Sequence, residues 1–266
     1  MTRLVAGVAG NPIGHSLSPA IHQAWIAAAG LDADYRPFEP ADVAAFDRLL
    51  DAGRAGELRG LNVTAPFKEQ ALARADEVAL TARACGSANL LLFEDGRIRA
   101  DSTDGAGLLA ALAEQAPDLR LRGAAAGVLG AGGAARAAVA ALRDAGASVT
   151  VINRTRSRAE ALAGDLGASV GGPEALAGAD LVVNALSVTP QIDHAALPTG
   201  AVLMDMTYRP LETAFLAAGR ARGLTPVDGL AMLIGQARPA FEALFGRPTP
   251  PLDIRAVALA ALEDAA

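Results

Sequence analysis

One lysine stands out among the residues of this chain that could carry chemistry. The sequence contains 22 arginines and a single lysine, Lys68. Lys68 follows a strand-like run, Leu58 to Val63, and it lies in the first turn of a helix that Pro66 is predicted to begin. A lysine ammonium can give up and regain a proton, whereas an arginine guanidinium stays charged. The position therefore suggests a proton donor or acceptor, and the alternative is a chance surface lysine.

The asparagines form a second group with possible binding roles. All of them fall at predicted strand ends or in loops: Asn11, Asn62, Asn89, Asn153 and Asn184. An amide both donates and accepts hydrogen bonds, so such residues suit a ligand that carries several hydroxyl groups. Turns and Asx motifs favour asparagine at the same places, which is the alternative explanation.

A glycine-rich turn provides the clearest binding motif. Residues 124–129 read as a buried strand, and Gly130-Ala131-Gly132-Gly133-Ala134-Ala135 then opens a helix with the pattern Gly-x-Gly-x-x-Ala. Gly130 permits a tight bend, and Gly132 lacks the Cβ that would keep the backbone away from a pyrophosphate. The helix N-terminus beyond it offers free N–H groups to an anion. A glycine-rich turn that binds nothing is the alternative.

The residues after the next predicted strand indicate which dinucleotide would bind. An NAD site would carry Asp or Glu there, but this chain has Asn153-Arg154-Thr155, with Arg158 one turn later. Guanidinium groups suit a 2′-phosphate, so the sequence predicts NADP(H) rather than NAD. A solvated helix start is the alternative, although cationic side chains oppose the helix dipole at that end.

Composition excludes several other classes of function. The chain has 266 residues, a net charge of −6 and no basic stripe, which argues against nucleic acid as a partner. The lone Cys85 excludes an internal disulfide and a cysteine-rich zinc site, and His15 and His22 lack the spacing of metal ligands. The uncharged run from Gly123 to Ala135 is too short to span a membrane. We therefore expect a cytoplasmic protein with no metal.

The order of elements predicts one mixed sheet and one parallel sheet. Ala88 to Glu94 and Arg97 to Ala100 flank Asp95-Gly96, which is typical of a hairpin. Strands and helices alternate beyond residue 124, which requires a parallel sheet with crossover connections. Near the N-terminus, Ser18 is the expected N-cap of a helix whose first turn contains Pro19.

Several motifs, taken in order, resemble those of the shikimate dehydrogenase family, NADP-dependent reductases of aromatic amino-acid (chorismate) biosynthesis. The resemblance covers nearly the whole chain. The motifs are residues 10–22, 62–68, Gly86-Ser87-Ala88-Asn89, Ser102-Thr103-Asp104-Gly105, the Gly130 turn, Asn153-Arg154-Thr155, Asp205-Met206-Thr207-Tyr208 and residues 229–236.

The resemblance implies an α/β fold with two domains: a mixed-sheet substrate domain and a Rossmann-type parallel-sheet NADP-binding domain. We predict the substrate-binding and catalytic domain at residues 1–104, the NADP-binding domain at 105–229, and C-terminal helices at 230–266 that return to the substrate domain. The expected partner is a small-molecule substrate, and the expected state is a monomer or homodimer.

The resemblance also assigns residues to roles. The catalytic pair would be Lys68 and Asp104, with lysine giving a proton to the oxygen of 3-dehydroshikimate as it is reduced to shikimate. Substrate-binding residues would be Ser16, Ser18, Asn62, Thr64, Asn89, Tyr208 and Gln236. Cofactor-binding residues would be Gly130, Ala131, Gly132, Gly133, Ala134, Asn153, Arg154, Thr155, Arg158, Met206 and Gly229. Ser18 and Asp104 could equally cap helices.

Four departures from the family pattern bear on the substrate. Gln23, Leu90, Ser102 and Leu186 replace the usual Asn, Thr, Asn and Thr. Quinate or an amino analogue of shikimate therefore remains an alternative substrate, and a non-catalytic NADP(H)-binding sensor of the same fold is a third interpretation.

Overall fold

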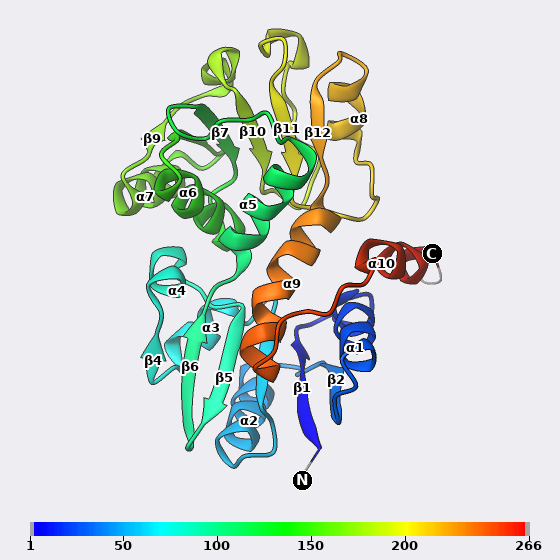
Figure 1. The fold of residues 1–266 in the computed structure, drawn as a ribbon. Helices are drawn as coiled ribbons and strands as arrows, with labels where there is room; N and C mark the ends of the chain where they lie inside the picture. The colour runs from blue at the N-terminus through cyan, green and yellow to red at the C-terminus, as the bar shows by residue number, and fades with distance from the viewer. Residues whose placement is uncertain (1–2, 264–266) are drawn as a thin grey trace. The chain divides into compact units, whose positions relative to one another are not determined.

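The chain divides into two compact units that share one helix. The computed structural model describes residues 3–263. The first unit comprises residues up to Thr103 and again from Gln236 onward, and the second runs from Asp104 to Gly235 (Figure 1). Helix α9 (Gly229–Phe245) therefore contributes to both units.

The first unit is built around a mixed six-stranded sheet. Its strands are β1 (Leu4–Ala9), β2 (Ala33–Phe38), β3 (Gly60–Val63), β4 (Glu77–Val78), β5 (Leu90–Glu94) and β6 (Arg97–Asp101). Its helices are α1 (Ser18–Ala28), α2 (Val43–Arg54), α3 (Lys68–Ala73), α4 (Leu80–Cys85), the C-terminal part of α9, and α10 (Ile254–Glu263).

The strand order in this sheet is β2-β1-β3-β5-β6-β4. The central strand β1 pairs in parallel with β2 and β3, whereas β5 is antiparallel to both β3 and β6. The hairpin at Asp95-Gly96 and the mixed sheet are thus confirmed. Near the chain ends, α10 packs beside α1, as Figure 1 shows in red and blue.

The second unit contains an all-parallel six-stranded sheet. Its strands are β7 (Ala125–Leu129), β8 (Ser148–Ile152), β9 (Ser169–Val170), β10 (Leu181–Asn184), β11 (Val202–Asp205) and β12 (Thr225–Val227). Between them lie α6 (Gly133–Asp144), α7 (Arg156–Leu166), α8 (Ala214–Arg220) and the 3₁₀ helices η1 (Pro173–Gly178) and η2 (His194–Ala196), and α5 (Asp104–Gln115) precedes the sheet.

Alternate residues of these strands enter two separate cores. Val183 belongs to one buried cluster and Val182 to another, and Met204 and Leu203 divide in the same way. Successive side chains of a strand point to opposite faces, so both faces of the sheet are covered. The parallel sheet predicted from the alternation of elements is confirmed.

The strand order is β12-β11-β10-β7-β8-β9, and it shows at which end of the sheet a ligand would bind. Ile152, Leu129, Asn184 and Asp205 end four neighbouring strands and lie in register across them. From β7 the chain adds β8 and β9 on one side, and after β9 it crosses back to add β10 on the other side of β7. Ligands of open α/β sheets bind outside the strand ends at such a switch point. The loops that follow these four residues therefore surround the candidate cofactor site.

Two local predictions are wrong. Ser18 is the first residue of α1 rather than its N-cap; Leu17 occupies that position without a side-chain cap. The N–H of Ser18 instead donates to Oγ of Ser16 at 3.3 Å. Pro66 does not begin α3, because residues 64–67 form a turn in which Phe67 N donates to Thr64 O at 3.0 Å, so the helix starts only at Lys68.

None of the helices within residues 3–263 is both long enough and apolar enough to cross a membrane.

Candidate active site

Lys68 is the first residue of α3 and is half-buried. Its carbonyl oxygen accepts a hydrogen bond from Ala88 N at 3.0 Å. This bond fixes the start of α3 against the segment that leads into β5. The predicted proton donor and the predicted ligand Asn89 thus come from two segments that are held together.

Asn89 is the centre of a buried hydrogen-bond network in the first unit. It is 4% exposed, and its Oδ1 accepts from Thr103 N at 2.8 Å. Its Nδ2 donates to Thr103 Oγ1 at 2.9 Å and to Gln236 Oε1 at 3.2 Å. The structure therefore brings together Asn89 and Gln236, two predicted substrate ligands that are far apart in the sequence.

Asn62 extends this network toward the edge of the sheet. Its Nδ2 donates to Asn89 O at 3.2 Å, and its Oδ1 accepts from the hydroxyl of Tyr35 at 2.8 Å. Tyr35 was not predicted as part of the site, and nothing in its local sequence pattern marks it, because the contact depends on β2 lying two strands from β3.

Tyr35 is held in its protonated form by its surroundings. Its ring stacks on His22 with a centroid separation of 4.0 Å and an interplanar angle of 3°. Burial raises the pKa of Tyr35 well above its ordinary value and lowers the pKa of His22 to about 3. At neutral pH the phenol is therefore a hydrogen-bond donor to Asn62, and the imidazole is neutral.

Thr64 and Ser16 lie on the loops that follow β3 and β1, and Ser18 begins α1 directly after the second of these loops. Thr64 N donates to Ala9 O at 2.9 Å, and a Cβ on Gly10 would lie 2.4 Å from Cγ2 of Thr64. The start of the loop that carries Ser16 and Ser18 is thus packed directly against Thr64. Both serines are half-buried.

Asp104 and Tyr208 belong to the second unit. Asp104 is the first residue of α5 and is 4% exposed. Tyr208 is half-buried in the connection after β11. 

The glycine turn has the geometry that the motif predicts. Gly130 follows β7 with φ +117°, a conformation that other residues rarely adopt. A Cβ at this position would also lie 3.2 Å from Leu186 Cδ2 and 3.3 Å from Ala185 O. Gly132 is the N-cap of α6, and apart from its two chain neighbours no atom of residues 3–263 lies within 4 Å of where its Cβ would be. The backbone next to the N-terminus of α6, which includes Gly133 and Ala134, therefore has space for an anion.

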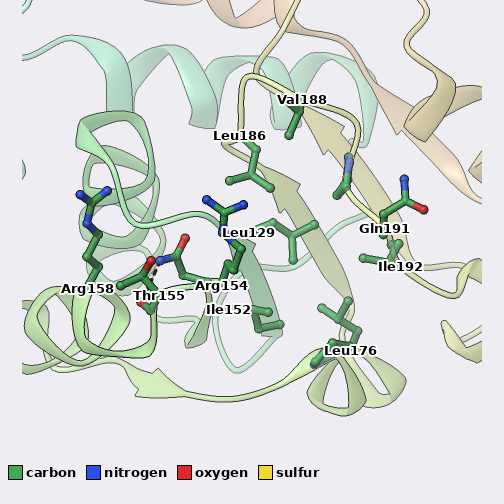
Figure 2. Close-up of a pocket in the computed structure, with 13 residues that line it drawn as sticks. Leu129, Ile152, Arg154, Thr155, Arg158, Leu176, Leu186, Val188, Gln191 and Ile192 are labelled. Carbon is green, nitrogen blue, oxygen red and sulfur yellow. Dashed lines mark hydrogen bonds between the residues drawn. The ribbon is translucent and has the colours of Figure 1, made fainter.

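A pocket of about 440 Å³ lies beside this turn at the ends of β7 and β8. Figure 2 shows Arg154 and Leu186 turned toward the same space, with Arg158 on α7 farther along. Its lining is Leu129, Ile152, Asn153, Arg154, Thr155, Arg158, Pro173, Leu176, Leu186, Val188, Pro190, Gln191 and Ile192. Apolar side chains suit the faces of a planar base, and the exposed guanidinium groups suit a phosphate.

The arginines near this pocket have different surroundings. Arg156 forms an ion pair with Glu160 at 2.8 Å and does not line the pocket. Arg154 and Arg158 line it and form no ion pair within residues 3–263. Asn153 Nδ2 donates to Thr155 O at 2.9 Å and so shapes the loop that presents Arg154.

Met206 and Gly229 come together on the other side of β11. A Cβ on Gly229 would lie 2.6 Å from Thr207 O and 2.8 Å from Met206 O. Glycine is therefore required at the start of α9 by the close approach of this backbone. The pocket residues after β10, from Leu186 to Ile192, were not predicted to bind the cofactor, because the sequence does not reveal that β10 lies next to β7.

Comparison with known proteins finds the family of the sequence motifs again, over nearly the whole chain. Residues 8–91 match the family model "Shikimate dehydrogenase substrate binding domain", and residues 111–197 match "Shikimate / quinate 5-dehydrogenase". A Caulobacter vibrioides protein named shikimate dehydrogenase (NADP(+)) is 51% identical, over 96% of this chain and 95% of its own.

Two solved structures show the same fold. The shikimate 5-dehydrogenase of Thermus thermophilus in complex with NADP(H) and shikimate is 38% identical, with a TM-score of 0.90 over 97% of this chain and 100% of its own. The quinate dehydrogenase of Corynebacterium glutamicum in complex with NAD is 30% identical, with a TM-score of 0.85 over 98% and 99%.

Proposed function

This chain belongs to the shikimate dehydrogenase family, and we propose that it catalyses the reversible, NADPH-dependent reduction of 3-dehydroshikimate to shikimate. The observation that carries the proposal is the 51% identity, over nearly the full length, to a relative named for this activity. It is supported by the arrangement of the motif residues, since Asn62, Asn89 and Gln236 are joined in one network.

The first unit is the proposed substrate domain. The proposed carboxylate ligands are the hydroxyl donors Ser16 and Ser18 of this unit and Tyr208 of the second unit. The proposed ligands of the ring hydroxyls are Thr64, Asn89 and Gln236 of this unit and Asp104 of the second. Both amide hydrogens of Asn89 are engaged within the protein, so a ring hydroxyl binds there by displacing the bond to Gln236. Lys68 holds the proton that is transferred to the carbonyl oxygen of the substrate, and Asp104 is the second proposed catalytic residue.

The second unit is the proposed NADP domain. The space beside Gly132 and the N-terminus of α6 fit the pyrophosphate, and Arg154 and Arg158 at the pocket fit the 2′-phosphate. The dinucleotide, when bound, supplies the hydride. The chain's own residues bind and orient it, with Met206 and Gly229 completing the site beyond β11.

An assay with three substrates and two cofactors tests this proposal. We expect oxidation of shikimate with NADP⁺ to have a higher kcat/KM than oxidation of quinate or aminoshikimate, and a higher kcat/KM than any reaction with NAD⁺. A quinate preference is the second candidate, favoured by the quinate dehydrogenase relative and by Ser102, whose buried hydroxyl has no hydrogen-bond partner among residues 3–263. Binding of NADP⁺ without turnover of any substrate would instead indicate a sensor.

We also propose that the protein acts in the cytoplasm, where the biosynthetic pathway supplies its substrate, as a monomer or homodimer. Light scattering of the purified chain distinguishes these two states.

A further inference from the structure

A buried polar cluster at the carboxyl edge of the parallel sheet has no part in the proposed chemistry. It consists of Asn184 at the end of β10, Asp205 at the end of β11, and Thr213 before α8, which are 1%, 1% and 6% exposed. We call these three residues the Asp205 clamp. Removing a carboxylate from water costs free energy that hydrogen bonds within the protein must offset. A buried carboxylate with a full set of such bonds therefore suggests a specific role.

The Asp205 carboxylate is held by neutral donors alone. Its Oδ1 accepts from Asn184 Nδ2 at 3.2 Å and from Thr207 N at 3.0 Å, and its Oδ2 accepts from Thr213 Oγ1 at 2.7 Å. Within residues 3–263 no basic side chain forms an ion pair with it. All three donors lie at the carboxyl end of a strand or in the connection that follows it, next to the candidate cofactor site.

Through Asn184 the clamp holds the connection 185–192. Oδ1 of Asn184 accepts from Leu186 N at 3.1 Å. Leu186, Val188 and Gln191 of this connection line the pocket that contains Arg154, and Leu186 also packs over the Gly130 turn. The orientation of the Asn184 amide is fixed by Asp205, because only its NH₂ group can face the carboxylate.

Through Thr207 and Thr213 the same carboxylate holds both ends of the connection 206–213. Thr207 N binds Oδ1 near the start of that connection. At its end, Thr213 donates to Oδ2 and its Oγ1 also accepts from Leu216 N at 3.3 Å, which caps α8. This connection carries Met206 and Tyr208, and its start lies against Gly229.

We propose that the Asp205 clamp positions the two connections that form the cofactor site, 185–192 and 206–213, before any ligand binds. The clamp residues are positioning residues and touch neither substrate nor cofactor in this role. A carboxylate suits the role because it accepts several hydrogen bonds at once, and bonds to an ionised acceptor are stronger than neutral ones. The identity of the ligand, NADP(H), rests on the proposed function.

The first test replaces the carboxylate by an amide of the same shape, Asp205→Asn. The amide oxygen can serve Asn184 and Thr207, but its NH₂ group then faces the Thr213 hydroxyl, and the ionised acceptor is lost. In the ligand-free variant we expect faster amide hydrogen exchange in 185–192 and 206–213 than in the wild type. The Kd for NADP⁺, measured by calorimetry, should rise about tenfold, which corresponds to one charge-assisted hydrogen bond.

Asp180→Asn is the matched control. Asp180 Oδ2 also accepts a hydrogen bond from a backbone N–H, that of Ala125 at 2.8 Å, but it lies at the opposite edge of the same sheet, before β10. We expect this variant to leave the Kd for NADP⁺ and exchange in both connections unchanged.

A second variant, Asn184→Asp, tests the orientation of the amide. It places two carboxylates at the 3.2 Å contact between β10 and β11, where both cannot stay ionised together. A shared proton relieves the repulsion, so the ratio of the variant's Kd for NADP⁺ to that of the wild type should be smaller at pH 6 than at pH 8. A ratio of one at both pH values would contradict the proposal that the clamp positions the cofactor site.

Thr213→Val keeps the test decisive if the other variants fold poorly. It removes one donor to Asp205 while keeping the shape of the side chain, and faster exchange should be confined to 206–213 and the first turn of α8. Unchanged exchange in both connections of Asp205→Asn, or an equal increase over all strands of the second unit, would overturn the proposal. Wild-type protein that binds NADP⁺ but does not oxidise shikimate would refute only the proposed function.

Discussion

The two proposed binding regions are built in opposite ways. In the first unit the candidate substrate ligands are bonded to each other, since Asn62 contacts Asn89 and Asn89 contacts Gln236. In the second unit the candidate phosphate ligands Arg154 and Arg158 are exposed, one on a loop and one in the first turn of α7. The candidate pyrophosphate site beside them is formed by the backbone of the Gly130 turn.

The difference indicates how each region should respond to change. A side chain in a bonded network positions its neighbours, so its loss spreads to them. An exposed arginine without an ion pair contributes mainly its own contact with the ligand. We therefore expect effects on the substrate to be coupled among residues of the first unit, and effects of single arginines on NADPH to be local.

Lys68→Ala should produce the largest effect, because it removes the proposed proton donor from the first unit. Loss of a general acid or base lowers kcat by about 10²–10⁴-fold. The KM for shikimate should change much less, since Lys68 is proposed to act on the reacting oxygen. Glu69→Gln, at the exposed neighbouring residue of α3, is the control. A turnover number that Lys68→Ala leaves unchanged would remove the lysine from the chemistry.

Arg154→Ala tests the local behaviour of the second unit. The lost contact with a phosphate corresponds to about 1.5–3 kcal/mol, which raises the KM for NADPH about 10- to 100-fold. The KM for NADH should stay nearly constant because NADH lacks the 2′-phosphate. Arg156→Ala, two residues away but paired with Glu160 outside the pocket, should change neither KM. Equal losses for both cofactors would disprove the phosphate role.

The pH dependence of stability tests the burial of His22, whose ring stacks on Tyr35 beside the hydrogen-bond network of the first unit. The pKa of buried His22 is about 3 in the folded chain, so the unfolded chain, with a pKa near 6.5, takes up a proton that the folded chain does not. This contribution to stability is complete above about pH 6.5 and is lost as the pH falls toward 3. Between pH 7.5 and 5 the loss is about 2 kcal/mol by linkage.

Urea unfolding at these two pH values measures the loss, and His22→Gln serves as the comparison because it lacks the titrating ring. The variant should lose about 2 kcal/mol less stability than the wild type over the same interval. If both proteins lose the same amount, His22 is not the group responsible.

Tyr35→Phe should give the smallest effect. It tests whether the loss of one hydrogen bond at Asn62 reaches the substrate ligands through the network. The variant keeps the stacking on His22 but removes the donor to Asn62 Oδ1. One neutral hydrogen bond is worth about 1 kcal/mol, so the KM for shikimate should rise about fivefold. The KM for NADPH should not change. A rise in the KM for NADPH instead would show that the two regions are not as independent as their construction indicates.

Much of the candidate site was predictable because its signals are local. The Gly130 turn and the arginines after β8 are each encoded within a few residues, and Lys68 stands out as the single lysine of the chain. The roles given to Ser16, Thr64 and Gln236 came from the resemblance to a family, since polar residues in loops have no pattern that specifies a substrate. Errors arose where local rules compete: Ser18 is already helical and its N–H donates to the Ser16 hydroxyl, so Leu17 takes the N-cap position, and a turn displaces Pro66 from α3.

By itself the sequence determined the two kinds of sheet, the dinucleotide turn and the choice of NADP(H) over NAD, because backbone bends and charges are set by residues close together in the chain. Only the tertiary structure decided which strand ends became neighbours. Tyr35 and Asn62, Asn184 and Asp205, and Asn89 and Gln236 are separated by 27, 21 and 147 residues, yet each pair shares a hydrogen bond. Strand order and packing create these contacts, and no local preference in the chain specifies them.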